Sequence, residues 1–212
     1  MNGNEVSASA AVPKKVIAAF DFDGTITTKD TFLPFLGRAF GRPRVLLTLA
    51  TLALPAFMVL IGKSNRDHFK ALLIGKLFPG ISVQYLEEKG SQHAAQIASL
   101  CRPTALERIK WHKQQGHRLV MVSASLNFYL EPISKQLGFE DLLCTQVVSV
   151  GGICTGEMKG ENCRAGAKVR RLEALLGPLG QYELYAYGDS DGDTEMLRAS
   201  NHPALMPFHA SM

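Results

Sequence analysis

Cysteine and tryptophan are scarce in this sequence of 212 residues. Its four cysteines are Cys101, Cys144, Cys154 and Cys163. None forms a C-x-x-C pair, and no histidine lies at metal-ligand spacing from one of them. This pattern argues against a disulfide scaffold and favours reduced thiols in a cytoplasmic protein. With one Trp, five Tyr and no internal period, the sequence also excludes a repeat architecture.

Acidic residues are absent from Thr31 to Arg66, although the chain carries 19 acids against 23 lysines and arginines, a formal charge of +4. The basic residues in this stretch are Arg38, Arg42, Arg44, Lys63 and Arg66. Between Arg44 and Lys63 nothing is charged, and most residues are apolar. Because the basic residues flank an apolar run and are not interleaved with stacking aromatics, nucleic acid is not the expected partner.

The apolar content of 46% is ordinary for a globular protein and excludes wholesale disorder. The length fits one compact domain, or one domain with a sizeable insertion. Residues 1–14 are mostly small and polar, and the first lysines come only at Lys14 and Lys15. A secretory signal begins with charge and continues with a long apolar run, so we expect residues 1–14 to form a flexible tail.

Short apolar runs then alternate with helical patterns. Strands are expected at 16–20, 119–122, 142–144, 184–187 and 204–206, a hairpin at 147–158, and helices at 128–137, 168–176 and 193–198. Continuous apolar runs without alternation predict strands that are buried on both faces, as in a parallel sheet. The alternation of strands with helices predicts an α/β fold with a Rossmann-like parallel sheet.

The segment 29–112 does not follow this alternation. It is rich in Leu, Ala, Lys and Gln and is typical of several helices. We therefore predict a catalytic core formed by 15–28 and 113–212, with 29–112 inserted as a helical cap between the first and second core strands.

Polar residues follow three of the predicted strands. Asp21 and Asp23 come after the first, Ser123 after the second and Asp189 after a later one. In open parallel sheets, ligands bind at the carboxyl ends of the strands, so these side chains are expected to converge. Asp193 follows closely and adds a fourth acid.

Four acids near one point repel one another unless a cation lies between them. Carboxylate and phosphate oxygens are preferred ligands of Mg²⁺. Lys168 would add a fixed positive charge and Ser123 a hydroxyl donor. This set suits phosphoryl transfer, where positioning and charge stabilisation do most of the work. Lys159 lies nearby and is the alternative lysine, whereas Asp191 is expected to be a loop residue.

The order of these residues resembles the haloacid dehalogenase (HAD) superfamily of phosphatases. Its four motifs match Asp21-Phe22-Asp23-Gly24-Thr25, then Ser123, then Lys168, then Gly188-Asp189-Ser190-Asp191-Gly192-Asp193. A lone Asp-x-Asp-Gly-Thr is equally well a turn, because Asp and Gly favour tight turns. The ordered set covers nearly all of the chain outside the cap.

The resemblance implies a role for each matched residue. Asp21 would be the nucleophile that becomes an aspartyl-phosphate, and Asp23 would protonate the leaving alcohol and then activate water. Mg²⁺ would be held by Asp21, the backbone carbonyl of Asp23, and Asp189. Asp193 would support the metal's waters or orient the lysine. The phosphate-binding set would be Ser123, Lys168, Gly24 and Ala124.

The position of the cap resembles the subgroup that contains phosphoserine phosphatase. Within it, Ser123-Ala124-Ser125 and the run from Cys163 to Lys168 resemble the IB hydrolases related to phosphatidylglycerophosphatase C. Phosphoserine phosphatases usually carry Ser at the position of Gly24 and Glu at the position of Asp30. Asp30 and Arg66 are candidate substrate contacts, and a solvated surface position is an equal alternative for each.

The apolar block 45–61 has nearly the length of a membrane span. A single crossing conflicts with the motif order, since Asp21 precedes the block and the other site residues follow it. A buried pair of cap helices, broken at Pro55, and an interfacial helix on an anionic lipid surface both remain open.

These observations predict a Mg²⁺-dependent phosphomonoester hydrolase. Its expected substrate is a phosphorylated small molecule or a phospholipid head group such as phosphatidylglycerophosphate. A soluble metabolite phosphatase of the phosphoserine phosphatase type, and a non-catalytic phosphate-binding protein, are the alternatives. We expect a cytoplasmic location, with a peripheral site at the inner membrane surface if 45–61 contacts lipid.

Overall fold

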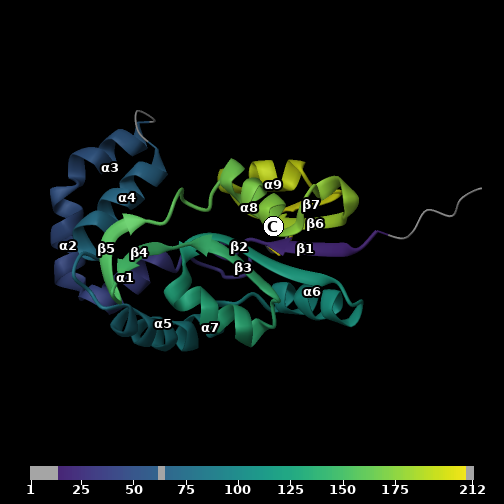
Figure 1. Ribbon diagram of the computed structural model, residues 1–212, viewed down its shortest axis with the longest axis horizontal. Helices are drawn as coiled ribbons and strands as arrows, with labels where there is room; N and C mark the ends of the chain where they lie inside the picture. Colours follow the sequence, from purple (N-terminus) through teal and green to yellow (C-terminus); the bar gives the residue numbers. More distant parts are fainter. Residues whose placement is uncertain (1–13, 62–64, 209–212) are drawn as a thin grey trace, which may run out of the picture.

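The computed structural model describes residues 14–61 and 65–208, so the predicted tail, apart from Lys14, and Lys63 lie outside the described residues. Parallel strands form the main sheet in the order β3-β2-β1-β6-β7 (Figure 1). Their bounds are β1 (Val16–Phe20), β2 (Arg118–Leu126), β3 (Asp141–Thr145), β6 (Glu183–Gly188) and β7 (His202–Leu205). The predicted α/β fold with a parallel sheet is confirmed.

Helices cover both faces of this sheet and build the cap (Figure 1). They are α1 (Phe32–Phe40), α2 (Arg42–Thr51), α3 (Ala53–Leu60), α4 (Arg66–Leu77), α5 (Val83–Ile97), α6 (Pro103–Gln114), α7 (Asn127–Leu137), α8 (Gly166–Leu176) and α9 (Thr194–Arg198). Three short 3₁₀ turns lie at Ala98–Leu100, Leu179–Gln181 and Asp191–Asp193. The five strands expected outside the hairpin and the three helices expected outside the cap are all present, with bounds shifted by a few residues at most.

The central strand β1 shows why its sequence is apolar without alternation. Ile17 and Ala19 belong to a buried cluster with residues of α8 and α9. Ala18 and Phe20 belong to a second cluster with residues of α6 and α7, on the opposite face. Successive side chains of a strand point to opposite faces, so a strand covered by helices on both sides must be apolar throughout.

The expected hairpin is present as the antiparallel pair β4 (Val147–Val150) and β5 (Ile153–Met158). It is not part of the main sheet but packs on the cap. Cys154 N donates to the Ile81 carbonyl at 2.8 Å, and Gly80 N donates to the Cys154 carbonyl at 3.0 Å. The division by sequence leaves this hairpin with the core, whereas in space it closes one side of the cap.

The helix α6 (Pro103–Gln114) lies almost entirely within the segment 29–112 predicted as cap, but it packs on the core. It covers the sheet, and its buried His112 places Nε2 2.8 Å from the Tyr187 hydroxyl on β6. Burial lowers the pKa of His112 to about 4, so the ring is neutral at neutral pH. The chain has already returned to the core before α6 begins, since Arg102 N donates to the Ile26 carbonyl at 2.8 Å, within the segment predicted as cap.

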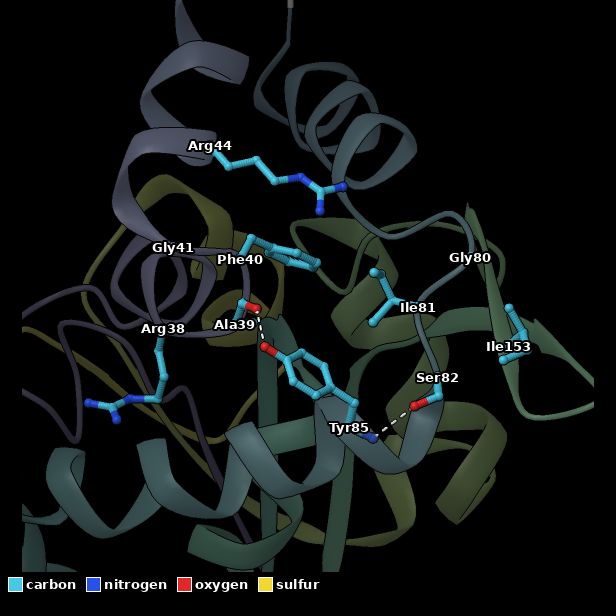
Figure 2. Close-up of a pocket in the computed structure, with 10 residues that line it drawn as sticks. All are labelled: Arg38, Ala39, Phe40, Gly41, Arg44, Gly80, Ile81, Ser82, Tyr85 and Ile153. Atoms are coloured by element: carbon cyan, nitrogen blue, oxygen red, sulfur yellow. Dashed lines mark hydrogen bonds between the residues drawn. The ribbon is translucent and has the colours of Figure 1, made fainter.

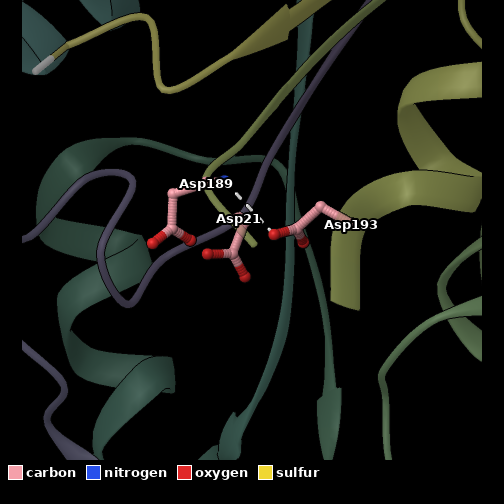
Figure 3. A group of neighbouring side chains, drawn as sticks. All are labelled: Asp21, Asp189 and Asp193. Carbon is pink, nitrogen blue, oxygen red and sulfur yellow. Dashed lines mark hydrogen bonds between the residues drawn. The ribbon is translucent and has the colours of Figure 1, made fainter. Parts of the chain in front are cut away.

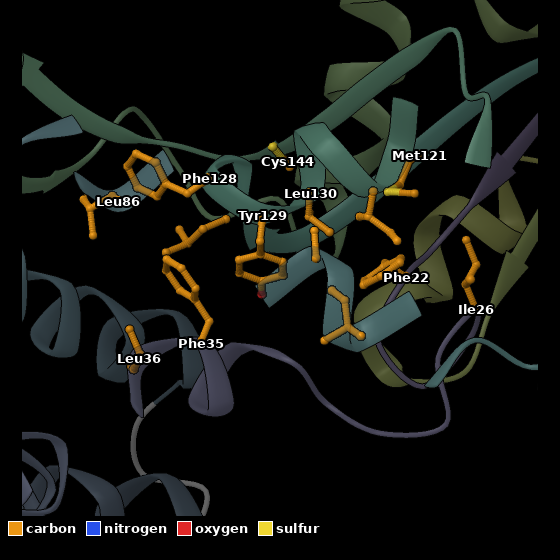
Figure 4. Packing of buried hydrophobic residues seen from close by; sticks show 14 of the residues in the cluster. Phe22, Ile26, Phe35, Leu36, Leu86, Met121, Phe128, Tyr129, Leu130 and Cys144 are labelled. Carbon is orange, nitrogen blue, oxygen red and sulfur yellow. The ribbon is translucent and has the colours of Figure 1, made fainter. Parts of the chain in front are cut away.

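One buried apolar cluster joins the core to the cap (Figure 4). Its members include Met121 on β2, Phe128 and Tyr129 on α7, Phe35 on α1, and Leu86 on α5. The Phe35 and Tyr129 rings lie 4.9 Å apart between centroids. Burial of this continuous surface favours one fixed placement of the cap over the sheet edge.

The apolar block 45–61 forms α2 and α3, which break at Leu52 and not at Pro55. Pro55 lies in the first turn of α3, where its missing N–H has no helical acceptor to lose. The pair is not buried as a whole: Val45 and Leu52 are buried, but Leu47 is 69% exposed and Leu54 71% exposed. Among the described helices none alone could cross a membrane; α2 with α3 passes by length and composition, with a 70° bend between them.

The outer side of the cap carries a hollow of about 640 Å³ between the α1–α2 junction, the 80–82 segment and β5 (Figure 2). Tyr85 lies on its wall, and its hydroxyl donates to the Ala39 carbonyl at 2.7 Å. Arg44 lies over the Phe40 ring, 5.6 Å from its centroid. None of the predicted site acids lines this hollow.

Candidate active site

Asp21 lies at the carboxyl end of β1, where its backbone N–H donates to the Tyr187 carbonyl of β6 at 2.9 Å. Lys168, in the first turn of α8, reaches across the sheet edge to this carboxylate. Its Nζ lies 2.6 Å from Asp21 Oδ1 and 2.5 Å from Asp193 Oδ1, and all three side chains are buried. The expected lysine is therefore Lys168; Lys159 is exposed.

Gly24 permits a close approach between the first and last motifs. Its φ is +77°, and a Cβ at this position would lie 2.1 Å from Asp189 Oδ2. Only glycine combines this backbone conformation with room for the carboxylate. Thr25 lies between the same two acids, and its hydroxyl contacts Asp21 Oδ2 at 3.1 Å and Asp189 Oδ1 at 3.4 Å.

Three carboxylates meet at this point: Asp21, Asp189 and Asp193 each offer an oxygen, and these oxygens lie within 4.8 Å of one another (Figure 3). Hydrogen bonds to the second carboxylate oxygen of Asp193 hold this side chain in place. Its Oδ2 accepts from the backbone N–H of Asp189 at 3.2 Å and of Ser190 at 3.1 Å. With Lys168 at Oδ1, both oxygens of the Asp193 carboxylate are held by hydrogen bonds.

The Asp23 carboxylate lies apart from this triad. Its Oδ1 accepts from Thr31 N at 2.8 Å and from Thr31 Oγ1 at 2.6 Å, and its Oδ2 accepts from the Ser125 hydroxyl. The resemblance assigns only its backbone carbonyl to a metal, so the carboxylate is available for proton transfer. Burial raises the pKa of Asp23 to about 6, and the charge of Asp30 adds to this rise.

Thr31 is itself held from two sides. Its carbonyl lies 3.0 Å from His93 Nε2, and its hydroxyl lies 3.4 Å from the Tyr129 hydroxyl. His93, Tyr129 and Thr31 are all buried. The residue that orients Asp23 is thus fixed by α5 and α7, and sequence motifs alone gave no sign of these contacts.

Burial and charge act against each other at the Asp21–Lys168 pair. Burial raises the pKa of Asp21, and Lys168 opposes this rise. Burial also acts to lower the pKa of Lys168, but the charges of Asp21 and Asp193 outweigh it and hold the lysine protonated. The site therefore presents a permanent cation beside the expected nucleophile.

Ser123 and Ala124 lie on β2 and line the same pocket as the acids. The buried Ser123 hydroxyl accepts from Ser125 N at 3.1 Å, so its own proton can be donated to a phosphoryl oxygen. The Ala124 carbonyl accepts from Nζ of Lys70, a residue of α4 that the sequence analysis missed.

Lys70 is buried, and its Nζ lies 4.6 Å from the centroid of the Phe32 ring. Burial lowers its pKa to about 8, although Asp23 and Asp30 act in the opposite direction. A lysine on the same helical face as Leu73, Ile74 and Leu77 was the available sequence signal. Its position adds a second buried lysine to the pocket, contributed by the cap.

The pocket has a volume of about 810 Å³ and lies between the sheet edge and the cap. Asp30 and Arg66 both line it and are exposed, and Asp30 Oδ1 accepts from Phe32 N at 3.0 Å. Both candidate contacts are thus at the pocket, on its solvent side. Asp191, predicted to lie in a loop, begins the 3₁₀ turn Asp191–Asp193; it is exposed and does not line the pocket.

The chain matches the family model of the haloacid dehalogenase-like hydrolases over residues 18–198. It is 36% identical over 195 residues to the protein CicA of Caulobacter vibrioides, covering 91% of this chain and 86% of that protein. It is 28% identical over 202 residues to a probable phosphatase of Mycobacterium tuberculosis, covering 91% of this chain and 69% of that protein. Among solved structures, a substrate-bound phosphoserine phosphatase matches this fold with a TM-score of 0.60 at 21% sequence identity. The match covers 89% of this chain and 84% of that one.

The fold and the acidic site define a hydrolase of the α/β class. The chain belongs to the haloacid dehalogenase-like hydrolase family. The matched residues begin within β1 and end at the last residue of α9, so they include all four motifs. The likeness to the phosphoserine phosphatase structure extends over most of the chain and concerns the fold.

Proposed function

We propose that this chain is a phosphatase, a Mg²⁺-dependent phosphomonoester hydrolase that works through an aspartyl-phosphate intermediate. The observation that carries the proposal is the meeting of Asp21, Asp189 and Asp193 with the buried Lys168 in one pocket. A protein that only bound phosphate would not require the separately held Asp23. Family membership supports the same reaction class.

The two carboxylates of the first motif suit different steps. Asp21 attacks phosphorus and forms the P–O bond as the bond to the leaving alcohol breaks. Asp23, held by Thr31 and Ser125, gives its proton to that alcohol and then takes a proton from the water that hydrolyses the intermediate. Lys168 and Ser123 are placed to stabilise charge on the phosphoryl oxygens.

The donor set fits Mg²⁺, which prefers oxygen ligands and keeps several waters. Asp21 and Asp189 would hold it together with the Asp23 carbonyl, and Asp193 would support its waters. When bound, the metal neutralises negative charge between the carboxylates and the substrate phosphate. Without it, the buried Lys168 offsets part of this charge through its ion pairs with Asp21 and Asp193.

We propose a phospholipid phosphate such as phosphatidylglycerophosphate as the substrate, in line with the resemblance to the IB hydrolases. The surface of α2 and α3 supports this. Its exposed apolar side chains include Leu46, Leu47, Leu54 and Phe57. Neighbouring basic residues and the missing acids suit an anionic bilayer. The protein would then act in the cytoplasm, in peripheral contact with the inner membrane surface.

A soluble phosphate ester of the phosphoserine type is the second candidate. Two observations favour it: the likeness in fold to phosphoserine phosphatase, and the cations Lys70 and Arg66 in the pocket, which suit a small substrate with a second anionic group. Gly24 and Asp30 depart from the usual residues of phosphoserine phosphatases, which favours the lipid substrate.

A phosphatase panel with and without Mg²⁺ tests the proposal. It contains phosphoserine, p-nitrophenyl phosphate, and phosphatidylglycerophosphate presented in anionic vesicles. We expect phosphate release from the lipid to exceed release from phosphoserine, and EDTA to abolish both. The same vesicles are sedimented to measure protein association. Turnover that does not depend on Mg²⁺ would contradict the metal assignment. A protein that stays in the supernatant and prefers phosphoserine would contradict the lipid substrate.

The raised pKa of Asp23 predicts a fall in activity with rising pH. A general acid must start protonated, and with a pKa of about 6 the protonated fraction of Asp23 decreases above that pH. We expect kcat/KM at saturating Mg²⁺ to decline above about pH 6. In Asp30→Asn the loss of a neighbouring negative charge lowers the Asp23 pKa, so the decline should move to lower pH. An unchanged profile in Asp30→Asn would contradict this assignment.

A further inference from the structure

The cap side of the active-site pocket carries an apolar wall. It is formed by Phe32, Leu33 and Pro34 at the start of α1 and by Phe69 and Leu73 on α4. The basic residues Arg66 and Lys70 of α4 line the same pocket. The cap therefore offers both apolar surface and positive charge to the part of a substrate that lies beyond its phosphate.

A second hollow of about 660 Å³ adjoins this wall, between α1, α2 and α5. Leu33 and Pro34 line both hollows, so the two are neighbours on either side of this part of α1. We call it the α1–α2–α5 groove. Its apolar lining continues along α2 with Val45, Leu46 and Leu49.

Basic side chains stand along this groove. Arg38, Arg42 and Lys89 are among its lining residues, and no Asp or Glu is among those described there. The Arg38 guanidinium donates to Gln96, which also lines the groove. An apolar strip with basic residues beside it matches a ligand that joins a hydrocarbon chain to an anionic group.

We propose that the α1–α2–α5 groove binds an acyl chain of the substrate while its terminal phosphate lies at Asp21. This proposal rests on the proposed lipid-phosphate hydrolysis and adds the site that would recognise the lipid portion. Its grounds are the position of the groove next to the active-site pocket, with Leu33 and Pro34 lining both, and the basic residues Arg38, Arg42 and Lys89 along it. The exposed apolar residues of α2 and α3 begin at the groove with Leu46, so a chain could pass into it from a bilayer surface.

An assay with monomeric short-chain lipid distinguishes acyl-chain binding in the groove from binding of the protein to a membrane. The kcat/KM for dihexanoyl phosphatidylglycerophosphate is compared, below its micelle concentration, with that for the same head-group phosphate without acyl chains. Each buried methylene contributes about a fourfold gain in affinity, so burial of only a few should raise the ratio about tenfold or more. A second readout is inhibition of p-nitrophenyl phosphate hydrolysis by dihexanoyl phosphatidylglycerol, which carries no phosphomonoester.

Leu46 and Leu47 provide a matched pair of variants. Both are exposed on α2, at 65% and 69%, but only Leu46 lines the groove. Leu46→Asp should lower the preference for the acylated substrate about tenfold and weaken inhibition by the dihexanoyl product. Leu47→Asp should keep the wild-type ratio. Thermal unfolding of both variants checks that the fold is intact.

The outcomes separate the two levels of the proposal. The groove is not an acyl site if the wild type shows the same kcat/KM for the dihexanoyl lipid and for its head-group phosphate without acyl chains. The same conclusion follows if Leu46→Asp and Leu47→Asp give equal ratios of these two kcat/KM values. In either case the phosphatase assignment stands. If the wild type hydrolyses phosphoserine but neither the dihexanoyl lipid nor its chain-free head-group phosphate, the lipid substrate is wrong and the groove proposal is overturned with it.

Discussion

Asp21→Asn should abolish turnover, with kcat reduced on the order of 10⁴–10⁶-fold, as for removal of other catalytic nucleophiles. The amide cannot attack phosphorus as a carboxylate does, and it carries no charge for a metal. The Lys168–Asp193 ion pair remains, so the fold should be retained. Phosphate release at saturating Mg²⁺ measures the loss of turnover, and circular dichroism of the purified variant checks that the fold is retained.

The control for this variant is Asp191→Asn. Asp191 lies two residues from Asp189 but is exposed and does not line the pocket. The same Asp-to-Asn change should therefore leave kcat within about twofold, in line with exposed positions away from a site. Turnover of Asp21→Asn within tenfold of the wild-type rate would show that another residue is the nucleophile.

Lys168→Met should remove both activity and much of the stability. The lysine lies between Asp21 and Asp193 at 2.6 and 2.5 Å, and its side chain is 2% exposed. Loss of one partner from a buried ion pair costs about 3–5 kcal/mol, because the remaining charges stay uncompensated. We expect a decrease of this size in the free energy of unfolding, measured with urea in EDTA at about pH 8, together with loss of phosphate release.

The sign of the pH dependence provides a further check on Lys168→Met. Burial already raises the pKa of Asp21, and removal of the opposing lysine raises it further. As the pH falls, the native state takes up protons at this acid before the unfolded state does, so the deficit in stability should shrink toward about pH 5. Lys159→Met, which changes an exposed lysine, is the control. An equal deficit for both variants, or one that grows at low pH, would contradict the assigned role of Lys168.

The core of the fold was predictable because its signals are local. An apolar run such as Val16–Phe20 has the length of a strand and is short for a helix, and its lack of alternation indicates burial on both faces. Acids directly after such strands must meet at one sheet edge. Asp21, Asp189 and Lys168 therefore came together in space as their order along the chain suggested.

The cap was less predictable, because its arrangement depends on contacts between distant segments. The break between α2 and α3 falls at Leu52, which is buried, and Pro55 is accommodated in the first turn of α3. The hairpin packs on the cap through backbone hydrogen bonds to the 80–83 segment. Neither outcome follows from the propensities of the residues involved, since tertiary contacts override them.

The sequence by itself determined the class of fold, the acids and lysine of the site, and the unusual absence of acids from 31 to 66. Only the tertiary structure decided what surrounds them. It placed Lys70 beside Ala124, held Asp23 through Thr31, and left α2 and α3 partly exposed beside an apolar groove. The physical reason is that catalytic motifs are set by short spacing along strands, whereas substrate recognition lies in surfaces assembled from segments far apart in the chain.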